Sequence, residues 1–278
     1  MQGTISVDKG RCTKCGSCIR LMKGYCIVES DGYPVFDLEI CNTCQKCVAI
    51  CPSLAIMVNN TYSDKIVDSI KNHSIDLLPL LEKRRSIKHF TDKSIPREIL
   101  DKILSVAKYA PNQNKNISIL VIDERGLLGE IDAYAISFVK QMHRMLFGFK
   151  PFTLFCSLFY GQMTVIKKKM EYDLNVKRHV IKENTQALII LTGNKWIATT
   201  FGSSIFMLAT MQLMAESLGV GSCPMDSLLL TLNGKRRLRK KLKIEDNVLG
   251  VLSLGYSSEN IVNIPRGYEA PIRWNMQT

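Results

Sequence analysis

The chain has 278 residues, of which 46% are hydrophobic, and its mean hydropathy of +0.03 is typical of a soluble globular protein with room for two domains. The first ten residues lack the apolar segment of a secretion signal, and the longest apolar stretches, 151–166 and 203–218, are shorter than the roughly 20 residues of a membrane span. We therefore expect a cytoplasmic protein with no membrane segment. The net charge of +12 would suit a nucleic-acid-binding protein, but no recognition motif accompanies the basic residues, so no nucleic-acid partner is expected.

Eight of the ten cysteines lie in the first 51 residues, in tight spacings. Two triplets, CTKCGSC (12–18) and CNTCQKC (41–47), are offset by 29 residues and form an internal repeat. Between them, residues 26–37 are typical of two short strands joined by an Asp-Gly turn. Without a secretion signal, this spacing indicates metal binding rather than disulfides. Zinc is the competing metal, but two overlapping triplets fit cubane iron–sulfur clusters better.

Residues 1–60 resemble the bacterial ferredoxins that carry two [4Fe-4S] clusters, including the final Cys-Pro pair. The resemblance implies a ferredoxin-like domain over residues 1–62, in which each triplet takes its fourth ligand from the other half of the repeat. One cluster would be held by Cys12, Cys15, Cys18 and Cys51, and the other by Cys41, Cys44, Cys47 and Cys26. Seven residues precede Cys26 instead of the usual three, so the alternative for Cys26 is a small buried residue.

After a polar linker at 59–64, helical patterns alternate with apolar runs. The segment 94–110 predicts a helix with Ser94 as its N-cap, and 203–219 predicts an apolar helix that ends at a glycine. Strands are predicted from residues rich in β-branched and leucine side chains over 117–123, 186–193 and 248–256. Few strands among many helices predict an α+β domain over residues 63–278.

The segment RRSIKHF (84–90) gathers the cations Arg84, Arg85 and Lys88 around the hydroxyl of Ser86. Such a group suits a phosphate monoester, although taken alone it is more often a solvated surface turn. Three later segments change this interpretation: AKYAPNQNKN (107–116), LGVGSCPMD (218–226) and IPRGYEAPIRWN (264–275).

With these four segments in this order, residues 75–278 resemble the nitroreductase family, whose members are FMN-dependent homodimers with an α+β sandwich fold. The resemblance implies that Arg84, Ser86 and Lys88 bind the phosphate and ribityl chain, and that Arg266 also reaches the phosphate. It implies a ring contact from Asn114 or Asn116, of which the first is preferred. A glycine-rich turn would lay the backbone against the ring, and its matching residues are Cys223, Pro224, Met225 and Asp226.

The two resemblances together predict an oxidoreductase with electrons passing through two clusters to FMN and on to a nitro compound, a quinone or an activated alkene. The sequence departs from the family where Asp226 replaces the common glutamate. The family resemblance therefore says little about which acceptor this chain uses. The alternatives are an electron-transfer adaptor between ferredoxin or flavodoxin and a protein or NAD(P) partner, and a redox sensor. Whether NAD(P)H or ferredoxin is the donor stays open.

Two further features have competing interpretations. The basic run 235–243 is either a solvated helix face with Leu238 and Leu242 turned inward, or a docking patch for an acidic ferredoxin or flavodoxin. Cys156, among aromatic residues, is expected to be a small buried side chain rather than a redox thiol. Cys223 borders the predicted flavin turn, where we expect it to serve packing.

Overall fold

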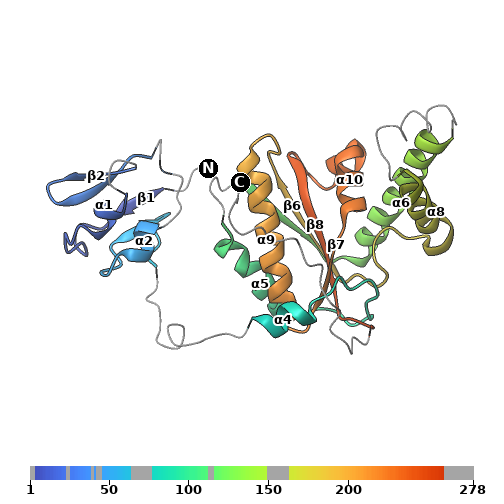
Figure 1. Ribbon diagram of the computed structural model, residues 1–278, viewed down its shortest axis with the longest axis horizontal. Helices are drawn as coiled ribbons and strands as arrows, with labels where there is room; N and C mark the ends of the chain where they lie inside the picture. The colour runs from blue at the N-terminus through green and yellow to red at the C-terminus, as the bar shows by residue number, and fades with distance from the viewer. Residues whose placement is uncertain are drawn as a thin grey trace, which may run out of the picture.

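The structure is a computed structural model that describes residues 4–22, 26–38, 41, 46–63, 77–111, 116–148 and 163–259. Its helices and strands form two groups, residues 4–63 and residues 77–259, and each group is considered by itself (Figure 1). Of the predicted site residues, Cys44, Asn114 and Arg266 lie outside the described residues, as does Cys156.

The N-terminal group consists of short elements that repeat in order. They are β1 (Ile5–Val7), α1 (Ser17–Met22), β2 (Ile27–Ser30), β3 (Tyr33–Phe36), α2 (Lys46–Ile50) and β4 (Ile56–Val58). Strand β1 pairs with β4 and β2 pairs with β3, both antiparallel. Asp31 and Gly32 have φ values of 54° and 80°, and a tight two-residue hairpin turn needs such positive values. The predicted hairpin is confirmed.

The C-terminal group is built around one four-stranded antiparallel sheet with the strand order β5-β6-β8-β7. Its strands are β5 (Ile117–Ile122), β6 (Ala187–Gly193), β7 (Gly221–Pro224) and β8 (Asn247–Gly255). Its helices are α4 (Leu78–Lys83), α5 (Arg97–Ser105), η1 (Val106–Tyr109), α6 (Arg125–Phe147), α8 (Met163–Tyr172), η2 (Asp173–Lys177), α9 (Ala198–Ser217), α10 (Asp226–Gly234) and α11 (Arg236–Lys241).

Helices cover both faces of this sheet, so β6 and β8 are buried on both sides (Figure 1). Side chains alternate along a strand, and Leu188 and Ile190 of β6 pack into the core formed with α6 and α10. Ile189 and Leu191 point the other way, into the core formed with α5 and α9. The domain is therefore an α+β sandwich of three layers, as predicted.

Three local predictions need correction. Pro96, not Ser94, holds the N-cap position of α5, and no side chain caps that helix. Proline suits this position because it has no N–H group to satisfy. Helix α9 begins at Ala198, earlier than predicted, and ends as expected before Gly219, whose φ is +71°. Residues 221–224 form the edge strand β7 rather than a turn, because β8 supplies hydrogen-bonding partners for their backbone.

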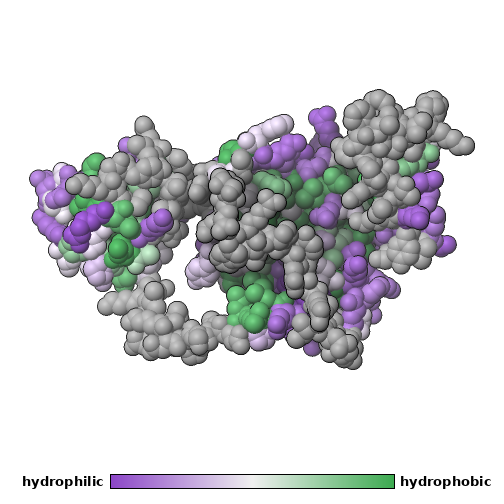
Figure 2. Space-filling view, in the orientation of Figure 1, coloured by the Kyte–Doolittle hydropathy of each residue, from purple (hydrophilic) through white to green (hydrophobic). Residues whose placement is uncertain are grey.

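Apolar side chains are exposed on α4 and α9. The green patch at the lower edge of the C-terminal group in Figure 2 lies where Figure 1 draws α4, and Leu78 and Leu81 of this helix are exposed. On α9, Phe201, Ile205 and Phe206 are also exposed. Among the described helices, none combines the length and the apolarity that crossing a membrane would require.

Candidate functional sites

Four cysteines from both halves of the repeat line one small cavity. They are Cys12, Cys15, Cys18 and Cys51, the set predicted to share one cluster. Cys51 lies directly after α2, and it reaches the first triplet because β4 follows it and pairs with β1. The described structure therefore brings together a four-thiol group that is spread along the sequence.

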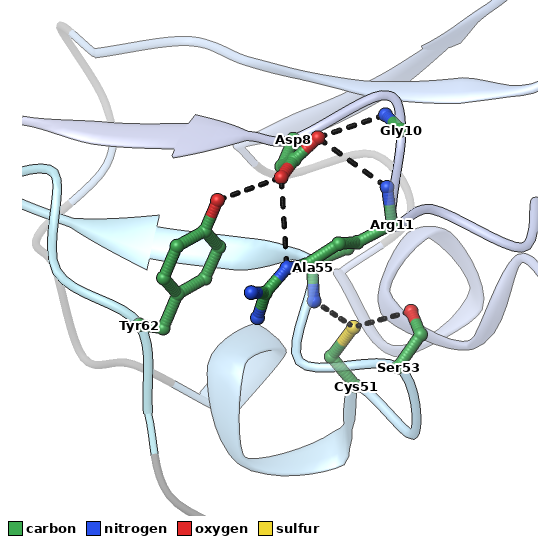
Figure 3. Close-up of polar contacts among 7 residues, drawn as sticks. All are labelled: Asp8, Gly10, Arg11, Cys51, Ser53, Ala55 and Tyr62. Carbon is green, nitrogen blue, oxygen red and sulfur yellow. Dashed lines mark hydrogen bonds and ion pairs between the residues drawn. The ribbon is translucent and has the colours of Figure 1, made fainter.

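Hydrogen bonds hold the sulfur atom of Cys51 at this cavity (Figure 3). The Ala55 N–H group donates to Cys51 Sγ at 3.3 Å, and Ser53 Oγ lies 3.6 Å from the same sulfur. Hydrogen bonding with the Ser17 side chain is the main reason that the pKa of the Cys15 thiol is lowered. Burial raises the pKa of the Cys18 thiol, and the charges of Cys51 and Cys15 add to this effect. Bound metal would remove the proton from each thiol.

Asp8 organises the loop before the first triplet (Figure 3). Its carboxylate accepts a hydrogen bond from the Tyr62 hydroxyl at 2.6 Å and further bonds from the Gly10 and Arg11 N–H groups. The bond from Tyr62 is the main reason that the pKa of Asp8 is lowered, and the same bond raises the pKa of Tyr62. The Asp8 N–H group donates to the Ala55 carbonyl, so this loop is hydrogen-bonded to the residue that directly precedes β4.

The backbone repeats the same pattern in the second half. Asp8 N–H donates to the Ala55 carbonyl and Cys12 N–H donates to the Asp8 carbonyl. The corresponding bonds run from Asp37 N–H to the Cys26 carbonyl, and from Cys41 N–H to the Asp37 carbonyl. Cys26 is therefore the structural counterpart of Ala55, and Ala55 lines the first cysteine cavity.

This correspondence places Cys26 beside the second triplet. Cys26 is 4% exposed and packs in one buried cluster with Cys41 and Cys47. After its seven-residue spacer, Cys26 directly precedes β2. Cys51, in contrast, directly follows helix α2. Cys44, the remaining predicted ligand, lies outside the described residues.

Within the described ranges, no three His, Cys, Asp or Glu side chains are arranged to hold a metal ion. The four cysteines of the first cavity are shown only to line it together.

A second cavity, of about 490 Å³, lies beside β7. Ser86 forms a parallel bridge with Ser222, and the Ile87 N–H group donates to the Ser222 carbonyl at 3.0 Å. This contact brings the 84–88 motif beside the segment 223–226. The residues that line the cavity are Ser86, Lys88, Asp173, Val180, Lys182, Cys223, Pro224, Met225, Asp226 and Ser227.

Six of the predicted flavin contacts thus share one cavity, and three others lie elsewhere in the described structure. Arg84 and Arg85 are half-buried and do not line it, and Arg85 Nη1 donates to the Arg84 carbonyl at 2.6 Å. Asn116 directly precedes β5, at the opposite edge of the sheet from β7. Cys223 is buried and its sulfur lies 3.5 Å from the Pro224 carbonyl oxygen.

Sequence reasoning missed four residues of the cavity wall, Asp173, Val180, Lys182 and Ser227. Ser227 follows the predicted residues in α10, whereas the other three lie in 173–182, a segment with no recognisable motif that begins with η2. Only its contact with the chain after Lys88 makes it part of the site: His89 and Glu183 form a parallel bridge.

Comparisons with known proteins agree with the fold of the C-terminal group. A model of the nitroreductase family matches residues 81–256. A nitroreductase with bound FMN from Desulfitobacterium hafniense DCB-2 is 15% identical, with a TM-score of 0.55 over 71% of this chain and 96% of its own. A nitroreductase with bound FMN from Bacteroides fragilis NCTC 9343 is 18% identical, with a TM-score of 0.55 over 73% of this chain and 100% of its own.

No match was found among curated proteins. The two solved structures show the fold alone, because their sequence identity is low. The family match extends over more than half of the chain, from α4 to the end of β8. This chain therefore belongs to the nitroreductase family.

Proposed function

We propose that this chain is an FMN-dependent oxidoreductase that receives electrons through two [4Fe-4S] clusters in residues 1–62 and passes them to an organic acceptor. The observation that carries the flavin assignment is the shared cavity of the 86–88 and 223–226 segments. The membership of the nitroreductase family supports it.

The residues of the cavity fit FMN in size and chemistry. Its volume of about 490 Å³ lies within the range of roughly 300–1,000 Å³ that small-molecule sites occupy. Lys88 supplies a cation and Ser86 a hydroxyl for a phosphate, while Cys223, Pro224 and Met225 supply a mostly buried wall. The bound flavin would supply the redox chemistry, since it can take electrons singly and release them in pairs.

The chain's own task at this site is to bind and orient. Ser86 and Lys88 hold the phosphate end, and the backbone of 223–226 forms the surface for the ring. Met225 is fixed because its N–H group donates to the Val251 carbonyl at 2.9 Å. Asp226 begins α10, so the positive end of that helix also faces the cavity. Arg266 and Asn114 lie outside the described residues and remain proposed flavin contacts. Arg84, Arg85 and Asn116 also remain proposed contacts, although they do not line this cavity.

The cysteine side chains of residues 1–62 are suitable ligands for two iron–sulfur clusters. Four thiols surround one cavity, and Cys26, Cys41 and Cys47 lie buried together in the other half. Soft thiolates are the ligands that iron–sulfur clusters use, and the Ala55 N–H bond to Cys51 would stabilise the charge of a liganded sulfur. A homodimer is also proposed, since a second copy would cover the exposed apolar residues Phe201, Ile205 and Phe206 of α9.

Protein purified without oxygen is expected to contain about eight iron atoms and one FMN per chain, because two cubane clusters hold four irons each. Iron, sulfide and flavin assays would check this. Reduced protein should then be reoxidised rapidly by small nitro compounds or quinones in stopped-flow absorbance. Absence of FMN would overturn the proposed function, and zinc in place of iron would overturn the cluster assignment.

An electron-transfer adaptor is a second candidate, favoured by a basic groove of about 720 Å³ beside α11. Arg239 Nη2 donates hydrogen bonds to the carbonyl oxygens of Glu245 and Asp246, so this side chain stabilises the fold. Arg236, Lys240 and Lys243 also line the groove and make no ion pair within the described part of the chain. Leu238 and Leu242 are buried beneath, as the competing interpretation of a solvated helix face predicts.

Reversing two of these charges tests the adaptor. The variant Lys240→Glu/Lys243→Glu is expected to slow reduction by a reduced ferredoxin at low salt by about tenfold. Electrostatic attraction between oppositely charged proteins raises their association rate by at least this much. The exposed Lys102 of α5 offers a control, and Lys102→Glu/Lys108→Glu should stay within about twofold of wild type. Equal rates for both double variants, with fast reoxidation by small acceptors, would exclude the adaptor.

A further inference from the structure

The two halves of the cysteine repeat share a backbone pattern but differ in charge. An offset of 29 residues matches the segment 8–20 with the segment 37–49, whose backbone hydrogen bonds correspond. The first segment contains one acid and four cations, which are Lys9, Arg11, Lys14 and Arg20. The second contains two acids and one cation, and the residues at the four corresponding places are Leu38, Ile40, Thr43 and Ala49. The repeat therefore does not need these four cations in order to fold.

The first triplet also lies closer to the surface than the described residues of the second. Of the cysteines that the structure describes, Cys15 alone is exposed, whereas Cys26, Cys41 and Cys47 are buried. Electrons pass between two proteins only where the donor and acceptor groups come close together. Among the described cysteines, Cys15 therefore offers a redox partner the closest approach.

Two of the lysines are held together beside this cysteine. Lys9 and Lys14 both lie over the ring of Tyr33, with their Nζ atoms 5.2 Å and 4.2 Å from its centroid. Lys14 Nζ also donates to the carbonyl oxygen of Asp31 at 3.0 Å, and Lys14 lines the first cysteine cavity. An aromatic ring and a carbonyl group fix an ammonium group without cancelling its charge.

The two arginines differ in their partners. Arg20 donates from Nη1 to the Cys15 carbonyl at 3.0 Å and from Nη2 to Ser17 Oγ at 3.3 Å, and both acceptors are uncharged. Arg11 Nε, in contrast, forms an ion pair with Asp8 Oδ2 at 3.7 Å. Arg20 and the two lysines make no ion pair with any residue that the structure describes. Three positive charges are thus left to attract an external partner.

We propose that Lys9, Lys14, Cys15 and Arg20 form a docking face for an acidic ferredoxin, which delivers electrons to the first cluster. Complementary charges steer such an encounter. In each encounter the ferredoxin is oxidised by one electron and the first-cluster site is reduced by one. Two encounters supply the electron pair that the flavin releases. The inference rests on the proposed function, since it needs this site to hold a cluster.

The competing explanation is that these cations only offset the negative charge of a bound cluster. The second half argues against it, because the same kind of cluster is proposed there beside one cation and two acids. A docking face explains why the cations gather in the half that exposes a cysteine.

Biolayer interferometry with an oxidised acidic ferredoxin measures docking without turnover. In protein purified without oxygen, Lys9→Glu/Lys14→Glu is expected to lower the association rate at low salt by about tenfold. The difference should shrink to about twofold near 1 M salt, where the Debye length is roughly 3 Å. The control Lys46→Glu/Lys102→Glu makes the same change in net charge at two exposed lysines, and it should stay within about twofold of wild type.

Iron assays on each variant separate docking from cluster assembly, and both double variants should keep about eight irons. If Lys14→Glu lowers the iron content, Lys9→Glu alone tests the same face, since its printed contact is with Tyr33 only. Loss of iron with a wild-type association rate would assign the lysines to the cluster and overturn the docking face.

Equal association rates for both double variants would also overturn the inference. So would a slower rate confined to Lys240→Glu/Lys243→Glu, which would place docking at the groove beside α11. Binding of an acidic flavodoxin but not of the ferredoxin would overturn the choice of partner. Wild-type protein with eight irons and FMN that does not bind ferredoxin would overturn this inference alone, whereas protein without iron would overturn the proposed function.

Discussion

Replacing Gly221 with alanine is expected to weaken FMN binding at least tenfold. A Cβ atom at this position of β7 would lie 2.8 Å from Ile87 Cγ1, 3.1 Å from Ile87 Cβ and 3.2 Å from the Gly255 carbonyl oxygen. Ile87 is buried, and rotation of its side chain cannot move its own Cβ, so the backbone of Ser86 and Lys88 must shift away. Overpacking of this kind costs about 1–3 kcal/mol, and about 1.4 kcal/mol corresponds to a tenfold change in affinity.

Titration of FMN fluorescence measures this effect, and circular dichroism reports whether the sheet persists. Gly129→Ala is the matched control, because no atom lies within 4 Å of the added carbon and the residue is in the exposed face of α6. This control should keep its FMN affinity. Adding Ile87→Ala to Gly221→Ala should recover part of the loss by removing the closest atom. Unchanged affinity in Gly221→Ala would show that the contact between 86–88 and β7 does not shape the flavin site.

The second large effect is expected at Cys26. Cys26→Ser should reduce the iron content from about eight to about four atoms per chain, since one of two four-iron clusters would lose a thiolate. The flavin content should not change, because the proposed FMN site lies within residues 77–278. Iron and sulfide assays on protein kept free of oxygen measure the loss.

The repeat offers a matched control for this substitution. Ala55 occupies the corresponding place in the other half and is fully buried, so Ala55→Ser adds a buried hydroxyl without removing a thiolate. It should retain about eight irons. Full iron content in Cys26→Ser would contradict the ligand role and leave Cys26 as a small buried residue, the alternative that its long spacer suggests.

Several local features of the fold could be predicted because they depend on neighbouring residues. The Asp31–Gly32 hairpin follows from residues that accept positive φ, and the end of α9 follows from Gly219. Strands β5, β6 and β8 follow from runs of β-branched and leucine residues. The predicted N-cap of α5 was wrong because Pro96 holds that position, two residues after Ser94, and its backbone carbonyl accepts the hydrogen bonds from the Ile99 and Leu100 N–H groups.

The flavin cavity could be predicted only in part. The 86–88 and 223–226 segments carry recognisable residues, and the structure brings them together through the Ser86–Ser222 bridge. Lys182 carries no signal in the sequence, because its place in the cavity wall depends on the pairing of His89 with Glu183. The contact of Asp132 with Val180 likewise depends on α6 packing against this segment. Helix α6 itself was not among the predicted elements.

The sequence by itself determined the chemistry of this protein: eight cysteines in a 29-residue repeat, and a serine and cations suited to a phosphate. Spacing and residue type are local properties, and they limit which ligands can bind. The tertiary structure alone decided which distant residues share a place: that Cys26 is the counterpart of an alanine in the other half of the repeat, and that Lys182 lines the same cavity as Lys88. These contacts depend on strand register and helix packing between distant segments, and no local pattern specifies them.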